Sequence, residues 1–204
     1  MKSKILLILT LTMSLTSCHK EMNTPFTEEE RALINESGFL MRVLTVDDPK
    51  DNEVLRRECT FMTDEEVQSP DFARLAVRMI ATVTSPEQDG VGIAGPQVGI
   101  NRRVVAVQRL DKPGEPFQVY PNIRITAVRG EKEEGREGCL SVPGRRGMVM
   151  RWRDIDISYT LVRASGNAVE TKDTAETIKG FTAVIFQHEC DHLDGVLYID
   201  RILQ

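Results

Sequence analysis

The 204-residue sequence is poor in aromatic residues and has no excess of basic charge. Aromatic side chains make up 5% of it, with one tryptophan, Trp152, and the formal net charge is −5. We therefore expect neither an aromatic platform nor a basic stripe for nucleic acid. Since 41% of the residues are hydrophobic and 28% are charged, the composition is that of a globular protein. One domain of ordinary size is expected, and no feature of the sequence implies an oligomer.

Cysteine and histidine are also scarce. The four cysteines are Cys18, Cys59, Cys139 and Cys190. They form no CxxC pair, which argues against a zinc ribbon or a disulfide framework. There are only three histidines, and two of them, His188 and His192, lie four residues apart. That spacing makes these two the first candidates for a functional site.

The first 18 residues resemble a bacterial lipoprotein signal. Lys2 and Lys4 precede an apolar run over 5–15, and the segment ends in Leu-Thr-Ser-Cys at Cys18. We predict that residues 1–17 are a signal segment and that Cys18 is lipidated, which would anchor the protein to a membrane of the bacterial envelope. The alternatives are a plain secretory signal, or a true start at Met22 and a cytoplasmic protein.

The remaining chain is predicted to consist of a tether and short helix over 18–38 and a single domain over 39–204. Thr27 and Glu30 fit a capping box at the start of that helix. Further predicted elements are strands over 39–46, 103–108, 117–125 and 155–162, helices after Ser69 and over 175–193, a solvated loop or hairpin over 124–137, and a turn over 165–167. Strands placed between an early and a late helix favour an α+β fold.

The sharpest chemical motif is Gln-His-Glu-Cys-Asp-His over 187–192. On a helix, His188 and His192 project from one face and can bind a single metal ion. Glu189 follows the first of them and can reach water at that metal. Apolar residues at helical spacing before the motif indicate that this helix is buried.

A catalytic metal site needs a third protein ligand. Only 12 residues follow His192, and none of them is His or Glu, so we expect the ligand upstream. Cys139 is the best candidate, because Gly138 before it and the Pro143-Gly144 turn after it present one thiol on a short, stiff segment. A lone cysteine without such a context is more often a small buried hydrophobic residue.

A glycine-rich segment, GVGIAGPQVG, covers residues 90–99. Its glycine spacing differs from that of a dinucleotide-binding motif, and Pro96 interrupts any following helix. We interpret it as a loop or edge strand whose backbone can lie beside a peptide, with the Gln97 side chain as an amide donor.

Taken in order, GVGIAGPQVG, EGCLS and QHECDHLDG are similar to the motifs of the peptide deformylases. The resemblance covers about residue 40 to the end of the chain. It implies mostly antiparallel strands around a central metal-binding HExxH helix. The sequence departs from the family in Gly95, which replaces an alanine, and in its signal-like segment, since the family acts on nascent chains in the cytosol.

The resemblance implies an enzyme that removes the formyl group from N-formylmethionyl peptides or nascent chains and releases formate. One divalent metal, Fe(II) in preference to Zn(II) or Ni(II), would be held by Cys139, His188 and His192. Glu189 would act as general base, with the Gln97 amide and the Leu140 backbone N–H stabilising the oxyanion. The residues expected to bind the substrate are Gly90, Val91, Gly92, Glu137, Phe181, Val184 and Ile185.

Two other functional classes fit the same residues. One is a periplasmic zinc peptidase or amidase, which would cleave internal peptide bonds in a larger cleft. The other is a non-catalytic lipoprotein that keeps the fold for binding. A formylated tripeptide compared with unformylated casein as substrate would separate the three.

Overall fold

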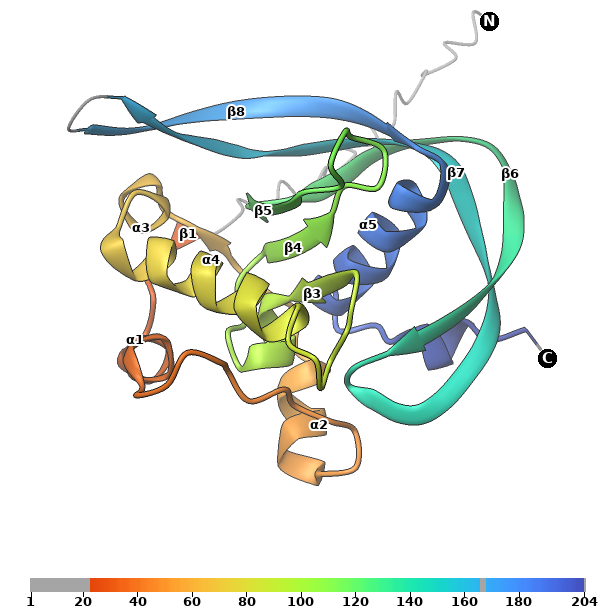
Figure 1. Cartoon of the computed structure of the whole chain (residues 1–204), viewed down its shortest axis with the longest axis horizontal. Coiled ribbons are helices and arrows are strands. Elements are labelled where there is room, and N and C mark those ends of the chain that lie inside the picture. The colour runs from red at the N-terminus through yellow and green to blue at the C-terminus, as the bar shows by residue number, and fades with distance from the viewer. Residues whose placement is uncertain (1–22, 166–167, 204) are drawn as a thin grey trace, which may run out of the picture.

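The computed structural model describes residues 23–165 and 168–203. It contains two antiparallel three-stranded sheets, one in the middle of the molecule and one that curves along its top and right-hand side in Figure 1. The first contains β3 (Gly92–Ala94), β4 (Val104–Gln108) and β5 (Phe117–Pro121), and the second contains β6 (Arg124–Cys139), β7 (Val142–Ser165) and β8 (Ala168–Lys179). Helix α5 (Gly180–Leu193) contacts strands of both sheets. The arrangement is the α+β fold that the sequence predicts.

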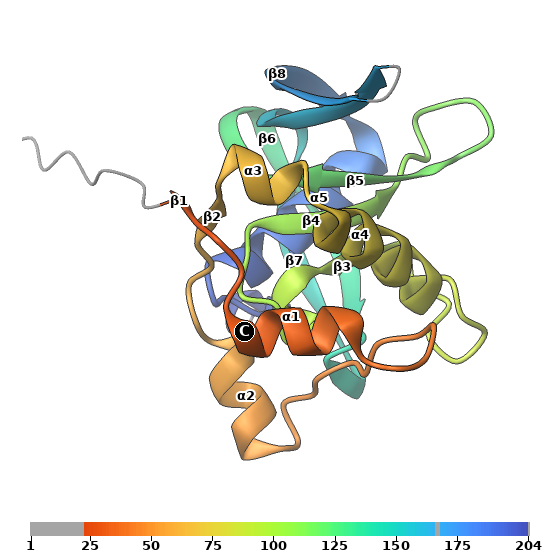
Figure 2. The ribbon, with the colours of Figure 1, turned by 90° about the vertical axis from the view of Figure 1, so that its left-hand side faces the viewer.

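The first half of the chain packs four helices beside the β3–β4–β5 sheet. They are α1 (Glu28–Asn35), α2 (Pro49–Leu55), α3 (Asp64–Val67) and α4 (Pro70–Val83). Strand β1 (Asn23–Thr24) pairs in parallel with β2 (Phe61–Met62). In Figure 2, α1 runs below α4 on the face turned to the viewer, and the two helices are in contact. Short 3₁₀ helices η1 (Gly95–Val98) and η2 (Tyr198–Arg201) complete the fold.

The predicted helix starts of the first half are confirmed. Thr27 and Glu30 form the capping box at α1, and the Ser69 hydroxyl accepts from the Phe72 N–H at the start of α4. Each cap satisfies a backbone N–H that has no partner within its helix, which stabilises the helix by about 1 kcal/mol. The capped helices place an apolar face of α4 against β3 and β4.

Two clusters of buried side chains lie on either side of the β3–β4–β5 sheet. Leu75 and Met79 of α4 pack with Val104 in one of them. Ile185 and Phe186 of α5 pack with Val105 in the other. Val104 and Val105 alternate in direction along β4, so one strand supplies both clusters. This packing holds α5, and every side chain it carries, against a rigid sheet.

Two predictions of local structure are wrong. No strand forms over 39–46: Met41 N–H donates to the Thr82 hydroxyl, and Leu44 and Val46 donate to the Gln97 and Ser141 carbonyls. Its hydrogen bonds thus go to scattered partners. The predicted loop or hairpin over 124–137 is strand β6, which pairs with β7 along its length. Its charged sequence reflects residues 128–134, which are exposed on both faces of the ribbon.

Two element boundaries also differ. The strand predicted over 117–125 is divided between β5 and β6 because Asn122 adopts a left-handed conformation, with φ 56°. The helix predicted from residue 175 begins at Gly180, since residues 175–179 pair with β7 as part of β8. Gly180 has φ 67°, a conformation that glycine tolerates best, and the chain turns there from strand to helix. The turn predicted over 165–167 extends outside the described residues.

Within residues 23–165 and 168–203, none of the helices combines the length and the apolar character that crossing a bilayer requires.

Candidate active site

Helix α5 carries the histidine motif at the centre of the molecule. The Gln187 amide locks it to β7, donating to the Trp152 carbonyl at 2.7 Å and accepting from the Trp152 N–H at 3.1 Å. One turn apart, His188 and His192 bring their rings to 5.2 Å between centroids. The predicted projection of both imidazoles from one helix face is therefore present.

Cys139 is brought to these histidines by the end of β6. A tight turn at Leu140 and Ser141 joins β6 to β7, and Cys139 pairs with Val142 across it. The Cys139 sulfur lies 3.2 Å from His192 Nε2. One ligand atom from each of Cys139, His188 and His192 lies within 4.8 Å of the other two, which is the spacing of donors around one metal ion. A thiolate and two imidazoles are donors that suit Zn(II) or Fe(II).

The two histidines differ in their electrostatics: burial alone would lower the pKa of His188, but hydrogen bonds with Cys139 and Glu137 outweigh it and raise that pKa well above its usual value, whereas the pKa of His192 shifts in the opposite direction. Burial lowers the pKa of His192 well below its usual value, which keeps this imidazole neutral, as a metal ligand must be. By contrast, Cys59 and Cys190 are buried in the hydrophobic core, and burial raises the pKa of the Cys59 thiol to about 12. The pKa of Cys190 is raised as well, again by burial. Among the described cysteines, Cys139 is the one that lies beside histidine.

His188 is oriented by a carboxylate from β6. Glu137 Oε2 lies 2.8 Å from His188 Nδ1, which leaves the opposite ring nitrogen for a metal. Arg151 binds both oxygens of this carboxylate, with Nε to Oε1 at 2.8 Å and Nη2 to Oε2 at 3.1 Å. Burial alone would raise the pKa of Glu137, but hydrogen bonds from His188 and Arg151 outweigh it and lower the pKa to about 2. Glu137 borders the cavity as predicted, yet protein groups occupy both of its oxygens.

Arg151 also links this hydrogen-bond network to η2 through Asp191. Arg151 Nη1 donates to Asp191 Oδ2 at 2.6 Å, and Arg201 of η2 grips Asp191 through Nε at 2.6 Å and Nη2 at 2.7 Å. Sequence reasoning did not single out Asp191 or Arg201. The available signal for Asp191 was its position inside the QHECDH motif. Arg201 had none, because only folding brings η2 beside α5.

Glu189 is buried, and one of its carboxylate oxygens has no hydrogen-bond partner among the described residues. It is 4% exposed, and within the described residues its Oε2 makes no hydrogen bond. Burial raises its pKa to about 7. A carboxylate with a pKa near neutrality can take and return a proton at physiological pH. Gly92 leaves room for it, because a Cβ atom there would lie 2.9 Å from Glu189 Cδ.

Gln97 lies on the other side of Cys139. Its Oε1 accepts from the Ala94 N–H at 2.8 Å, which fixes the orientation of the amide. Nε2 then points to Ser141 Oγ at 3.2 Å and to Cys139 Sγ at 3.5 Å. The amide donor predicted at the end of the glycine-rich segment is thus held next to the candidate metal ligand.

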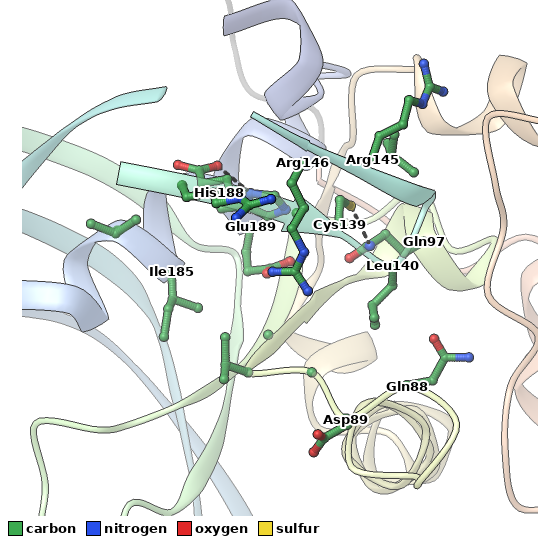
Figure 3. A pocket seen from close by; sticks show the side chains of 18 of the residues that line it. Gln88, Asp89, Gln97, Cys139, Leu140, Arg145, Arg146, Ile185, His188 and Glu189 are labelled. Carbon is green, nitrogen blue, oxygen red and sulfur yellow. Dashed lines mark hydrogen bonds and ion pairs between the residues drawn. The ribbon is translucent and has the colours of Figure 1, made fainter. Parts of the chain in front are cut away.

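These groups border a cavity of about 670 Å³ (Figure 3). All seven predicted substrate-binding residues line it, together with Gln97, Cys139, Leu140, His188 and Glu189. Val184 and Ile185 are buried, whereas Phe181 is 53% exposed and stands at the mouth. His192 is buried beneath the cavity, and Cys18 lies outside the described residues. Strand β3, which lies in the glycine-rich segment, forms one edge of its sheet, as predicted.

Known proteins that are similar to this chain in sequence and fold are peptide deformylases. The sequence profile described as Polypeptide deformylase matches residues 40–204. A peptide deformylase of Leptospira biflexa is 38% identical over 165 residues, covering 74% of this chain and 83% of the relative, and one of Desulforudis audaxviator is 41% identical over 133 residues, covering 65% and 79%.

Solved structures agree with the sequence relatives. The peptide deformylase of Thermotoga maritima superposes with a TM-score of 0.65 at 32% identity, covering 81% of this chain and 99% of that one. The Met-Ala-Ser-bound peptide deformylase of Acinetobacter baumannii gives 0.67 at 32% identity, covering 80% and 98%. The chain therefore belongs to the polypeptide deformylase family, and its activity is that of a peptide deformylase.

Proposed function

We propose that this chain removes the formyl group from N-formylmethionyl peptides with one divalent metal held by Cys139, His188 and His192. The observation that carries the proposal is the convergence of these three donors to within 4.8 Å. Glu189 and Gln97, the two groups needed for proton transfer and oxyanion stabilisation, line the same cavity.

The metal, when bound, supplies a Lewis acid that activates water and polarises the formyl carbonyl. We propose Fe(II) as the native ion, as the family resemblance implies, with Zn(II) or Ni(II) as replacements. The donor set supports this range, because one thiolate and two imidazoles suit Fe(II) and Zn(II) alike.

The chain's own residues would perform the proton transfers and stabilise the developing charge. Glu189 accepts a proton from the attacking water and delivers it to the departing amine nitrogen. The Gln97 Nε2–H and the Leu140 backbone N–H donate to the oxyanion that develops on the formyl oxygen. Preorganised donors of this kind contribute about 3–4 kcal/mol each to transition-state stabilisation. The contact between Gln97 Oε1 and Ala94 supports this role, since the donor needs no reorientation.

Strand β3 and α5 would position the peptide. On one side of β3, the Val91 carbonyl accepts from the Gln108 N–H at 2.8 Å, so the sheet continues along that side. The other side faces the cavity, where an extended peptide can pair with the backbone of Gly90–Gly92 as an added strand. Val184, Ile185 and Phe181 provide an apolar pocket for the methionine side chain.

Release of formate from formyl-Met-Ala-Ser, compared with cleavage of unformylated casein, tests this proposal. We expect formate from the tripeptide and no cleavage of casein. Cleavage of casein would favour the peptidase alternative. Binding of the tripeptide without any release of formate, by protein that contains stoichiometric metal, would favour the non-catalytic one.

We also propose that the mature protein is anchored to a bacterial membrane by acylated Cys18, after removal of residues 1–17. The support is the charged start, the apolar run and the terminal Leu-Thr-Ser-Cys of the sequence. Labelled fatty acid should enter the wild-type chain but not Cys18→Ala. A chain that begins at His19 should deformylate at the wild-type rate, because every proposed site residue lies at residue 90 or beyond. Recovery of the native protein from the cytosol with Met22 as its first residue would refute the anchor only.

A further inference from the structure

Three arginines line one wall of the cavity, and none of them has an anionic partner within the described chain. This basic rim consists of Arg136, Arg145 and Arg146, all exposed at the cavity surface. Elsewhere arginines are generally engaged: Arg102, for example, binds the Glu30 carboxylate, and Arg109 binds that of Glu176. The basic rim therefore offers positive charge that the described part of the protein does not neutralise.

The pairing of β6 with β7 directs two of these side chains to the same place. Gly138 pairs with Arg146, and Arg136 pairs with Met148, so Arg136 and Arg146 project from one face as diagonal neighbours. A Cβ atom at Gly138 would lie 3.4 Å from Arg146 Cγ and 3.8 Å from its Cζ. The Arg146 side chain thus lies over the backbone beside Cys139, and Figure 3 shows it extending across the cavity.

Arg145 stands on a bulge of β7. Cys139 pairs with Val142 and Gly138 with Arg146, so residues 143–145 have no counterpart on β6. Gly144 has φ 70°, which allows the chain to bend outward at this point. The bulge carries Arg145 to the edge of the cavity, beyond the metal ligands.

The wall of the cavity opposite the basic rim carries an amide and a carboxylate side chain instead of arginines. Gln88 and Asp89 lie across the cavity from Arg145 and Arg146 (Figure 3). The other carboxylates of the cavity, Glu137 and Glu189, are buried, and that of Glu137 is bound by Arg151 and His188. A wall of like charges beside a low-dielectric cavity attracts anions and raises their local concentration.

We infer that the basic rim recognises a carboxylate of the peptide downstream of the formylmethionine, so that acidic N-formyl peptides are the preferred substrates. This inference rests on the proposed function, because it requires the formyl group to enter the metal site while the following residues pass the rim. The carboxylate has two sources, an Asp or Glu side chain at the second or third position, or the terminal carboxylate of a short peptide.

The test compares kcat/KM for C-terminally amidated formyl-Met-Ala-Glu and formyl-Met-Ala-Gln, which differ only in charge. At low ionic strength we expect the Glu peptide to react about 5- to 20-fold faster, as a few partly exposed ion pairs allow. In 0.5 M salt the ratio should fall toward one, because exposed charges are then screened. Formyl-Met-Ala-Ser as free acid and as amide measures the contribution of a terminal carboxylate.

Variants of the three arginines test whether the basic rim causes the preference for a carboxylate. In the double variant Arg136→Gln/Arg145→Gln, and separately in Arg146→Gln, the preference for a carboxylate should drop to less than half of its wild-type value. Arg163→Gln is the matched control, since Arg163 is exposed on β7 but does not line the cavity. It should keep the wild-type preference.

The inference would be overturned if the wild-type enzyme reacted equally fast with charged and uncharged peptides in both comparisons. It would also be overturned if all the rim variants kept the wild-type preference for a carboxylate. Binding of the rim to anionic phosphatidylglycerol vesicles, with equal rates for all peptides, would instead make it a membrane contact and refute the inference. In each of these cases formate would still be released. Absence of formate from every formylated peptide would refute the proposed function itself.

Discussion

The Glu137 carboxylate and the His188 imidazole are joined by a 2.8 Å contact between Oε2 and Nδ1, across 51 residues of sequence. This contact sets the ring orientation of one proposed metal ligand from a different element of the fold. Arg151 holds the carboxylate from behind and is itself bound to Asp191, which Arg201 grips. The candidate metal centre is therefore supported by a chain of alternating charges that is buried as far as Asp191 and ends at the exposed Arg201 of η2.

Glu137→Gln should weaken metal binding by about 10- to 100-fold, because a neutral amide orients His188 less firmly and leaves the buried Arg151 with one carboxylate partner. Competition with a chelator during metal titration measures the effect. Glu133→Gln is the control, since Glu133 lies on the same strand but is exposed and pairs only with Arg153. Equal metal affinity in Glu137→Gln and wild type would contradict the positioning role.

Cys139→Ser should lose metal and activity together, because a neutral hydroxyl replaces a thiolate ligand poorly. Metal analysis of the purified variant, alongside formate release, checks this. Cys190→Ala is the internal control: its thiol is buried in the hydrophobic core, between the two histidines in sequence but facing away from them. Full metal content and normal turnover in Cys139→Ser would refute the ligand assignment.

Glu189→Gln should separate metal binding from chemistry. The amide keeps the shape of the side chain but cannot accept a proton, so metal content should stay near one per chain while kcat falls about 10²- to 10⁴-fold. Single-turnover release of formate, with metal content matched to wild type, measures the loss. A decrease of less than tenfold would show that another group is the base.

Gly92→Ala should impair catalysis while leaving the metal bound. The added Cβ would overlap Glu189 Oε1 and lie 2.9 Å from Cδ, so the carboxylate must move away from the cavity. We expect kcat to fall by about 10²-fold, since displacing a catalytic group by one ångström has an effect of that order. In the control Gly135→Ala, the nearest atom would be 4.0 Å away, and activity should be unchanged. Normal turnover of Gly92→Ala would contradict the close packing of β3 on Glu189.

The ion pair of Glu176 with the buried Arg109 should make part of the stability depend on pH. The hydrogen bond from Arg109 holds the pKa of Glu176 below its usual 4.5. Its stabilisation is thus fully present above that value and is lost as the pH falls through the lower pKa of the folded state. At pH 7, Glu176→Gln should unfold more easily by about 1–3 kcal/mol, since it weakens a partner of a buried charge.

Denaturant unfolding at pH 7 and at pH 3.5 measures this dependence. The difference between wild type and Glu176→Gln should shrink at the lower pH, where the carboxyl is largely protonated in the unfolded state and folding must release its proton. A difference that stays constant, or that grows on acidification, would show that the ion pair does not contribute through its charge.

Local patterns in the sequence were sufficient to predict candidate metal ligands. The four-residue spacing of His188 and His192 determines that they share a face of α5, because helical geometry repeats at that interval. The lack of a downstream ligand indicated Cys139, and the glycine-rich segment indicated an exposed edge strand. The caps of α1 and α4 could also be predicted, since a cap involves residues only three positions apart.

Interactions between distant segments could not be predicted from local sequence patterns. Whether residues 124–137 form a loop or a strand depends on pairing with β7, and the stretch over 128–134, exposed on both faces, carries no alternation of polar and apolar residues to reveal it. Ile178 continues the helical spacing of the apolar residues of α5, but the pairing of residues 175–179 with β7 overrides that local preference. Residues 39–46 look like a strand, yet within the described part of the chain they pair with no strand.

The sequence by itself supplied the candidate metal ligands and base, through residue type and short-range spacing, and the reaction class, through the resemblance of its three motifs to those of the peptide deformylases. Only the tertiary structure decided how the ligands are supported and what the cavity presents to a peptide. The contacts from Glu137 to His188 and from Arg201 to Asp191, like the clustering of Arg136 and Arg146, depend on the register of β6 against β7 and on the docking of η2. That register is set by packing and by a bulge at residues 143–145, and no single segment of the sequence encodes it.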